Sequence, residues 1–299
     1  MTEDSDSSET VTPVIGVIGG SGLYDIEGLA DREWRKLETP WGAPSGEMLF
    51  GRLGGVPCVF LPRHDRGHRH SPTSLPYRAN ISALKQAGCT EILSLSAVGS
   101  LRADAPPGTF VIVDQFVDRT FAREKSFFGE GCVAHVSMAD PVCRRLGDAL
   151  EQACRDLSLP HRRGGTYLAM EGPQFSTRAE SELYRAWGCD VIGMTNMPEA
   201  KLAREAELCY ATVAMVTDFD CWHPDHDHVT VELVVKTLFE NAAKARALVQ
   251  KVVPVLGQER PLCWAGCQRA LENAVITAPE KRDAALVANL RSVAGRVLD

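Results

Sequence analysis

The sequence lacks the long apolar runs, the surplus of basic residues and the leader-like segment typical of membrane, nucleic-acid-binding or secreted proteins. No apolar run in the 299 residues reaches the roughly 18 that a membrane-spanning helix requires, so no such helix is expected. The formal net charge of −7 argues against a nucleic-acid or membrane partner. Residues 1–12 are acidic and rich in Ser and Thr, without the basic and apolar parts of a signal peptide. They predict a disordered tail on a cytoplasmic protein.

The ten cysteines include no Cys-x-x-Cys pair. Several lie in apolar segments, where a reduced cysteine packs as a small apolar side chain. Cys263 and Cys267 are four residues apart, which leaves a local pair or a loose metal clip open. Because no second pair of Cys or His lies near them in the sequence, we expect ordinary thiols there, no metal site and no cofactor.

Apolar runs of strand length alternate with segments of helical periodicity along most of the chain. The runs are continuous, as in strands covered on both faces, and they predict strands at 14–20, 56–61, 91–96, 110–113, 165–170, 190–194 and 209–216. The helical period predicts helices at 75–87, 141–157, 176–187, 229–253 and 280–298. No repeat, linker or change of composition interrupts this alternation. The pattern therefore predicts one α/β domain, residues 13–299, with a central mixed sheet flanked by helices.

A glycine-rich turn, Gly19-Gly20-Ser21-Gly22, follows the first predicted strand. Such a turn lets backbone N–H groups approach an anion, and the Ser21 hydroxyl adds a donor. The spacing from Gly16 is G-x-x-G-G-x-G and not the dinucleotide pattern G-x-G-x-x-G, no clear helix follows, and the lysine of a triphosphate loop is missing. A purely structural turn explains the segment equally well, and a dinucleotide-dependent oxidoreductase remains the less favoured alternative.

Residues 62–70 contain three arginines and three histidines and directly follow a predicted strand. Arginine makes forked contacts with phosphate oxygens, and α/β proteins hold ligands at strand ends. We therefore predict an anion site that includes Arg63 and His64, in preference to a solvated basic loop. No carboxylate pattern supports a metal site at the histidines.

Three other segments lie between predicted elements. Residues 96–100 end a strand with small side chains that leave backbone donors accessible, although an ordinary loop explains them as well. Residues 171–180 link a strand to a helix, and Phe175 there offers an aromatic face for a base, while a core position is the commoner explanation for an isolated Phe. Residues 194–199 lie between a strand and a helix.

Asp218 and Asp220 close the predicted strand 209–216. Two carboxylates at the end of a buried strand are costly unless they bind something, and a helix cap explains one of them more easily than two. A purine offers an amine that donates to a carboxylate and a ring nitrogen that must be protonated as the base leaves. The pair therefore predicts a purine-base site.

Taken together and in this order, the segments resemble the methylthioadenosine phosphorylases, within the trimeric purine nucleoside phosphorylase family. The matching phrases are IGVIGGSGLYD (15–25), LPRHDRGHRHSP (61–72), YRANISALKQAGC (77–89), SAVGSLR (96–102), DQFVDRT (114–120), MEGPQFSTRAESELYRAWGCDVIGMTNMPEAKLAREAELCYA (170–211) and TDFDCW (217–222). The likeness spans about residues 14–250. It implies a single α/β domain around a mixed sheet with a distorted barrel, assembled as a homotrimer with the active site near a subunit interface.

The resemblance also implies residue roles. The phosphate-binding residues would be Ser21, Arg63, His64, Ser96, Ala97 and Thr195. The substrate-binding residues would be Phe175, Ser176, Asp218 and Asp220 at the base, Met194 at the ribose, and Val231, Val234 and a neighbouring subunit's His135 around the 5′ group. The catalytic residues would be Asp218 or Asp220, which protonate purine N7, and His64, which positions the phosphate with Arg63. The chain departs from the family pattern at Ser21 and Ser96, where threonine is expected more often, at Asp65, where glycine is expected, and at Asn196.

Two positions carry the expected choice of base. In the 6-oxopurine phosphorylases of the family, Glu is typical at the position of Ser176 and Asn at that of Asp218. A carboxylate accepts a hydrogen bond from a 6-amino group but faces repulsion from a 6-keto oxygen. The resemblance therefore implies cleavage of 5′-methylthioadenosine to adenine and 5-methylthioribose 1-phosphate, with inorganic phosphate as co-substrate. A phosphorylase of 6-oxopurine nucleosides or of methylthioinosine remains the alternative.

Overall fold

The computed structural model describes residues 10–20, 22–223 and 231–298, and within 231–236 the side chain of Val235 alone. The strands are β1 (Thr10–Val11), β2 (Ile15–Gly19), β3 (Leu29–Arg35), β4 (Met48–Leu53), β5 (Val56–Pro62), β6 (Glu91–Ser100), β7 (Phe110–Ile112), β8 (Gln115–Asp118), β9 (His161–Arg163), β10 (Thr166–Ala169), β11 (Val191–Gly193), β12 (Cys209–Asp218) and β13 (Arg260–Pro261). The helices are α1 (Tyr77–Gln86), α2 (Arg144–Asp156), α3 (Arg178–Ala186), α4 (Asn196–Glu205), α5 (Val231–Leu256) and α6 (Ala284–Leu298).

Eleven of the strands form one mixed sheet, in the order β3-β4-β5-β2-β6-β11-β10-β8. A branch leaves this path at β6, where β12 pairs with β6, β7 with β12 and β9 with β7. The expected α/β domain with a mixed sheet is confirmed. The pairings of the described residues form an open, branched path, and the distorted barrel stays a prediction.

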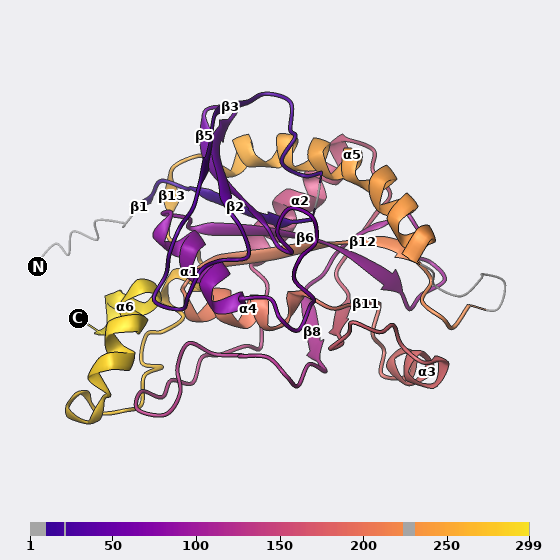
Figure 1. The fold of residues 1–299 in the computed structure, drawn as a ribbon. Helices are drawn as coiled ribbons and strands as arrows, with labels where there is room; N and C mark the ends of the chain where they lie inside the picture. Colours follow the sequence, from indigo (N-terminus) through magenta and orange to yellow (C-terminus); the bar gives the residue numbers. More distant parts are fainter. Residues whose placement is uncertain (1–9, 21, 224–230, 299) are drawn as a thin grey trace, which may run out of the picture.

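Helices cover both faces of the sheet (Figure 1). On one face, α2 and α5 pack together over side chains of β2, β5 and β12. On the other face lie α1, α4 and α6. Within β2, Ile15 and Val17 pack on the face covered by α2 and α5, while Ile18 packs on the face covered by α1, α4 and α6. Burial on both faces explains why the predicted strands are continuous apolar runs.

All seven predicted strands and all five predicted helices are present, with ends shifted by a few residues. The sequence pattern missed β1, β3, β4, β8, β9, β13 and α4. Six of the seven residues of β3 are exposed, so its sequence carries no apolar signal. This strand is the first element after the glycine-rich turn, where a dinucleotide fold would need a helix.

The structure bears on two further expectations, the disordered N-terminal tail and the lack of a membrane-spanning helix. Thr10 and Val11, which we placed in the disordered tail, pair with Pro261 and Arg260 as a two-stranded ladder. Residues 1–9 lie outside the described residues. Among the helices that the structure describes, none combines the length and the apolar character needed to cross a membrane.

Candidate active site

The sheet opens at β6, where two neighbouring strands end on the same edge. On that edge, β2 pairs with β6 as far as Ser94, and β11 pairs with Gly99 and Ser100. The other edge is covered by β12. In the described pairings, residues 95–98 therefore have no strand beside them on one edge. Ligands of α/β proteins bind at such divergence points, and the polar segments singled out in the sequence converge here.

Arg63, the residue after β5, is buried in this gap. Its Nε and Nη2 atoms donate to the two carboxylate oxygens of Glu199 at 2.9 and 3.2 Å. Nη2 also donates to the Ser94 hydroxyl at 2.7 Å, and Nη1 to the Leu95 carbonyl at 2.8 Å. These bonds occupy four of the five N–H groups of the guanidinium. The predicted anion-binding arginine is therefore charge-balanced within the protein, with one N–H group left over.

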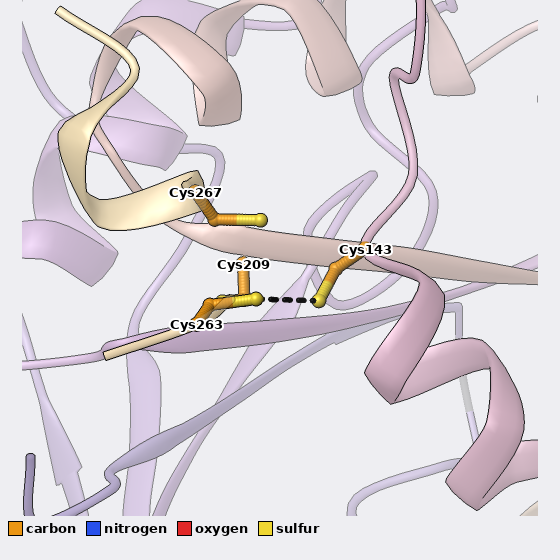
Figure 2. Close-up of side chains that lie close together, drawn as sticks. All are labelled: Cys143, Cys209, Cys263 and Cys267. Carbon is orange, nitrogen blue, oxygen red and sulfur yellow. Dashed lines mark hydrogen bonds between the residues drawn. The ribbon is translucent and has the colours of Figure 1, made fainter. Parts of the chain in front are cut away.

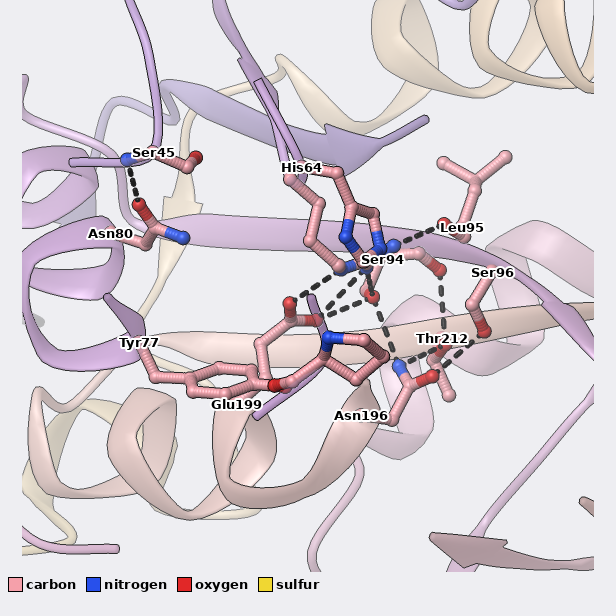
Figure 3. Close-up of polar contacts among 12 residues, drawn as sticks. Ser45, His64, Tyr77, Asn80, Ser94, Leu95, Ser96, Asn196, Glu199 and Thr212 are labelled. Atoms are coloured by element: carbon pink, nitrogen blue, oxygen red, sulfur yellow. Dashed lines mark hydrogen bonds and ion pairs between the residues drawn. The ribbon is translucent and has the colours of Figure 1, made fainter. Parts of the chain in front are cut away.

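Arg63 belongs to a set of hydrogen-bonded, buried polar side chains that we call the β6 network, and Figure 3 labels Ser94, Ser96, Asn196, Glu199 and Thr212 among its members. Its members are Arg63, Ser94, Ser96, Asn196, Glu199, Tyr210 and Thr212. Asn196, a departure from the family pattern, is its centre: Nδ2 lies 2.7 Å from the Tyr210 and Thr212 hydroxyl oxygens, and Oδ1 accepts from the Ser96 hydroxyl at 2.7 Å. Burial lowers the pKa of Arg63, but the charge and hydrogen bonds of Glu199 outweigh it and raise that pKa.

His64 lies half-buried next to Arg63 in the chain. Its Nδ1 is 2.8 Å from the His70 carbonyl oxygen, and its ring stacks on His68 at 4.2 Å between centroids. Burial, reinforced by the charge of Arg63 and opposed by the bond to His70, lowers the pKa of His64 to about 4. The ring is therefore neutral at pH 7, and because a carbonyl only accepts, Nδ1 carries the proton and Nε2 is the acceptor.

The other two arginines of segment 62–70 form ion pairs outside the β6 network. Arg66 pairs with Glu47 at 2.6 Å and Arg69 with Asp65 at 3.2 Å, and both arginines are exposed. The Asp65 carboxylate also accepts the Arg66 backbone N–H at 2.7 Å. The broad cationic focus expected from the sequence is therefore reduced to Arg63, and Asp65 serves to close its own loop.

Asp218 and Asp220 lie at the carboxyl end of β12 and are each 6% exposed. The Thr217 hydroxyl donates to Asp218 Oδ2 at 2.7 Å, and the Asp220 backbone N–H donates to Asp218 Oδ1 at 2.8 Å. Asp220 Oδ2 has no hydrogen-bond partner among the described residues. Burial raises the pKa of both carboxyl groups. We call these two residues the carboxylate pair.

Gly99 joins the two halves of the site. A Cβ atom there would lie 2.9 Å from Asp218 Oδ1 and 3.1 Å from Ile192, so no larger residue fits without displacing the carboxylate. Ser96 of the β6 network is three residues earlier on the same strand, about 10 Å away at the rise of an extended chain. A nucleoside-sized ligand spans such a distance. The half-buried Ala97 lies between the two halves.

Of the other residues predicted for the base, the ribose and the phosphate, Ser176 is brought to the carboxylate pair. Ser176 precedes the capping box of Thr177 and Glu180 that begins α3, and its hydroxyl is one of the groups that lower the pKa of Asp220 against the effect of burial. Phe175 is 44% exposed, which rules out the core position. Met194 follows β11 and packs its sulfur against Gly172. Thr195 is buried at the N-cap of α4, where its side chain makes no capping bond.

Sequence reasoning missed Arg123, whose side chain is fully buried. It donates to Glu171 at 3.0 Å, to the Tyr77 hydroxyl at 2.9 Å and to the carbonyl oxygens of Met194 and Met197 at 2.5 and 2.7 Å. Hydrogen bonds from Thr73, Phe121, Ala122 and Arg123 outweigh burial and lower the pKa of Glu171 to about 2. Arg123 therefore fixes the loops that carry the ribose and base residues. No local pattern around it could have shown this, since its partners are 46 to 74 residues away.

The described residues do not test the placement of the other four predicted residues at this site. His135 is exposed, and its backbone N–H donates to the Ala274 carbonyl in the C-terminal segment. Ser21 lies outside the described residues, as do the side chains of Val231 and Val234, whose backbone begins α5.

The chain belongs to the phosphorylase superfamily, whose family model matches residues 14–254. The matched residues therefore include the mixed sheet, the β6 network and the carboxylate pair.

Within this superfamily the chain is similar to several methylthioadenosine phosphorylases. It is 65% identical to the S-methyl-5′-thioadenosine phosphorylase of Rhodospirillum rubrum, over 96% of this chain and 97% of that protein. It is 63% identical to that of Cereibacter sphaeroides, over 95% and 98%. A methylthioadenosine phosphorylase from an antarctic soil metagenomic library superimposes with a TM-score of 0.87 at 45% identity, over 95% of this chain and 99% of that one. A mutant adenosine/methylthioadenosine phosphorylase of Schistosoma mansoni, solved with methylthioadenosine, gives 0.81 at 38% identity, over 87% and 96%.

Proposed function

We propose that this enzyme cleaves 5′-methylthioadenosine with inorganic phosphate, releasing adenine and 5-methylthioribose 1-phosphate. The observation that carries the proposal is the carboxylate pair at the carboxyl end of β12: two buried acids with raised pKa, one of which has an oxygen without a hydrogen-bond partner among the described residues. The relatives named above, similar over nearly the whole chain, support the same activity.

At the base, Asp218 and Asp220 bind and protonate the adenine. A carboxyl group with a raised pKa carries the proton that N7 must receive as the C1′–N9 bond breaks. The partner carboxylate accepts from the 6-amino group. Ser176 leaves room there, and a 6-keto oxygen would face the carboxylates with no donor between them. We therefore favour adenine over hypoxanthine and guanine as the released base.

At the other end, phosphate binds between the β6 network and the first strand. The remaining N–H group of Arg63, the hydroxyls of Thr195 and Ser21, and the backbone of Ala97 supply donors. The Ser96 hydroxyl, which donates to Asn196 Oδ1 in this structure, turns its hydrogen to phosphate on binding. Neutral His64 offers Nε2 as an acceptor for the hydroxyl hydrogen of phosphate. An oxygen of phosphate then forms the new bond to C1′ while the ribose develops positive charge. Positioning and electrostatics supply the catalysis, and phosphate is a co-substrate with no further cofactor in the reaction.

The similarity to methylthioadenosine phosphorylases also supports proposals on the oligomeric state and the cellular compartment. We propose a homotrimer in the cytoplasm, in which His135 of the neighbouring subunit closes the 5′ pocket beside Val231 and Val234. The exposure of His135 in this chain supports a role across an interface. An apolar 5′ pocket discriminates weakly among methylthio, deoxy and hydroxy groups, so some turnover of adenosine is expected.

The test follows free base released from methylthioadenosine, methylthioinosine and inosine, each with and without phosphate. Phosphate-dependent release of adenine from methylthioadenosine, far exceeding release of hypoxanthine from the other two, is the expected result. Release of hypoxanthine alone would overturn the base assignment while keeping the reaction. Release from no nucleoside would overturn the proposed activity.

A further inference from the structure

Four cysteines from three distant parts of the chain meet at one buried point (Figure 2). Cys143 precedes α2, Cys209 begins β12, and Cys263 and Cys267 lie in the segment after α5. Their sulfur atoms all lie within 4.8 Å of one another, and those of Cys143 and Cys263 are 3.6 Å apart. Each residue is at most 5% exposed. The structure thus supplies the second cysteine pair that the sequence did not show beside Cys263 and Cys267.

These distances match a tetrahedral metal site. Zinc–sulfur bonds of about 2.3 Å place the sulfurs of a tetrahedral site with four thiolate ligands about 3.8 Å apart, which lies within the observed spread. A disulfide needs about 2.05 Å between its sulfur atoms, so two disulfides would require the sulfurs to move together in pairs. Four soft thiolate ligands, without carboxylate or imidazole, favour zinc over magnesium or calcium.

The charges around the cluster suit thiolates. Arg204 donates to the Cys267 sulfur at 3.8 Å and Arg260 to the Cys209 sulfur at 3.9 Å. Arg145 and Arg260 both pair with the buried Glu91. Three arginines less one glutamate leave two positive charges beside the cluster, and zinc bound by four thiolates carries two negative charges. Buried charges are tolerated when they are balanced in this way.

The backbone of the Cys263–Cys267 segment is shaped as a ligand loop. Gly266 has φ +69°, and its N–H donates to the Cys263 carbonyl at 2.8 Å, which turns the two sulfurs toward the same side. The Cys263 N–H is itself held by the Gln268 side chain at 2.9 Å. Cys267, Gly266 and Arg204 also line a cavity of about 920 Å³, so one of the four cysteines borders a cavity from which an ion can enter.

We propose that Cys143, Cys209, Cys263 and Cys267 bind one zinc ion that fastens the C-terminal segment to the start of α2 and β12. The site is structural. Asp218 is nine residues after Cys209 on the same strand, about 30 Å along it, so the ion takes no part in the reaction. Binding displaces the four thiol protons, and zinc affinity falls as the pH is lowered. The same C-terminal segment holds the backbone of His135.

The test measures zinc per chain in the purified full-length protein by mass spectrometry of the metal. Wild type is expected to carry about one zinc per chain, with a zinc-edge absorption spectrum of four sulfurs at about 2.3 Å. Cys263→Ser is expected to lose at least nine-tenths of it. Cys154→Ser, which alters a buried cysteine of α2 outside the cluster, is expected to keep it. A mercurial titration of wild type, releasing zinc as thiolates are modified, gives the same answer if Cys263→Ser does not fold.

Three outcomes would overturn the proposal. Wild type could contain no stoichiometric zinc, with all ten cysteines titrating as free thiols. The intact mass could be lower by the hydrogens lost in disulfides among the four residues. Zinc could remain in Cys263→Ser, or its absorption spectrum could show nitrogen or oxygen ligands.

Discussion

The two halves of the candidate active site use burial in opposite ways. In the β6 network, Arg63 and Glu199 satisfy each other, and Ser94, Asn196 and Thr212 complete the hydrogen bonds around them. In the carboxylate pair, burial raises the pKa of both acids and leaves Asp220 Oδ2 without a partner among the described residues. In the first half, the buried charges are balanced within the protein before a ligand binds. In the second half, a buried carboxylate oxygen gains a hydrogen-bond partner only when a ligand binds.

This difference predicts that mutations in the two halves separate stability from activity. Removing a member of a satisfied, buried ion pair strands its partner, which is costly for the fold. Removing a carboxyl group that costs free energy to bury harms the chemistry and spares the fold. Four experiments test this separation, beginning with the largest expected effect.

Asp218→Asn should lower kcat/KM for methylthioadenosine by about 10²- to 10⁴-fold, the usual contribution of a general acid. An amide of the same shape cannot protonate N7, while the melting temperature should stay near that of wild type. Steady-state kinetics and thermal unfolding measured on the same preparation check both parts. Asp104→Asn, at an exposed ion pair with Arg102, is the control. Unchanged kcat/KM in Asp218→Asn would remove Asp218 from the mechanism.

Glu199→Gln should show the opposite profile. Arg63 and Glu199 are 3% and 4% exposed, and loss of one charge from such a pair lowers the free energy of unfolding by about 3–5 kcal/mol. Urea unfolding at pH 7.5 measures this loss. Glu182→Gln, which breaks an exposed pair with Arg185, should cost less than about 1 kcal/mol. If Glu199→Gln and Glu182→Gln lowered the free energy of unfolding equally little, the β6 network would not be the half of the site on which the stability of the fold depends.

The pH dependence should come from the carboxylate pair and not from His64. A carboxyl group whose pKa is raised in the folded state stabilises the fold most below its ordinary pKa of about 3.9, and this stabilisation is lost as the pH rises through the raised value. The protonated acid disappears over the same interval, so kcat/KM should fall there. His64, with a pKa of about 4, stays neutral above pH 5 and adds no inflection.

Profiles of kcat/KM at constant saturating phosphate, for wild type and Asp218→Asn, check this assignment. Dividing the wild-type profile by that of Asp218→Asn cancels the titration of phosphate itself. This quotient should decline with rising pH. A flat quotient would assign the titrating group to another residue.

The sequence predicted the elements of this fold well where burial is two-sided. Strands such as β2 and β12 are continuous apolar runs, while β3 is exposed and left no pattern. At the candidate site, Asp218, Asp220 and Arg63 were singled out because charges at the ends of buried strands are unusual, and their roles stay predictions. The partners of those charges could not be found in the same way. Glu199 is 136 residues from Arg63, and only the folded chain shows that it cancels the arginine's charge.

The same limit applies to the cysteines. The spacing of Cys263 and Cys267 identified one pair. Cys143 is separated from that pair by the helices α2 to α5 and the strands β9 to β13, and Cys209 is separated from it by β12, α5 and β13. Long-range proximity is a property of topology and not of local pattern. It also explains Arg123, whose role depends on carbonyl oxygens in two remote loops.

The smallest effect is expected at Asp65, a charged residue at a position where the family resemblance leads us to expect glycine. Asp65 has φ +64°, a conformation that Asn also tolerates, and its carboxylate is held by Arg69 and the Arg66 N–H. Asp65→Asn should therefore change the free energy of unfolding by less than about 1 kcal/mol and the KM for phosphate by less than about twofold. Phosphate saturation curves for the two proteins measure the second quantity. A severalfold fall in KM would mean that the carboxylate repels phosphate, and the charges of segment 62–70 would then have to be counted as part of the phosphate-binding half after all.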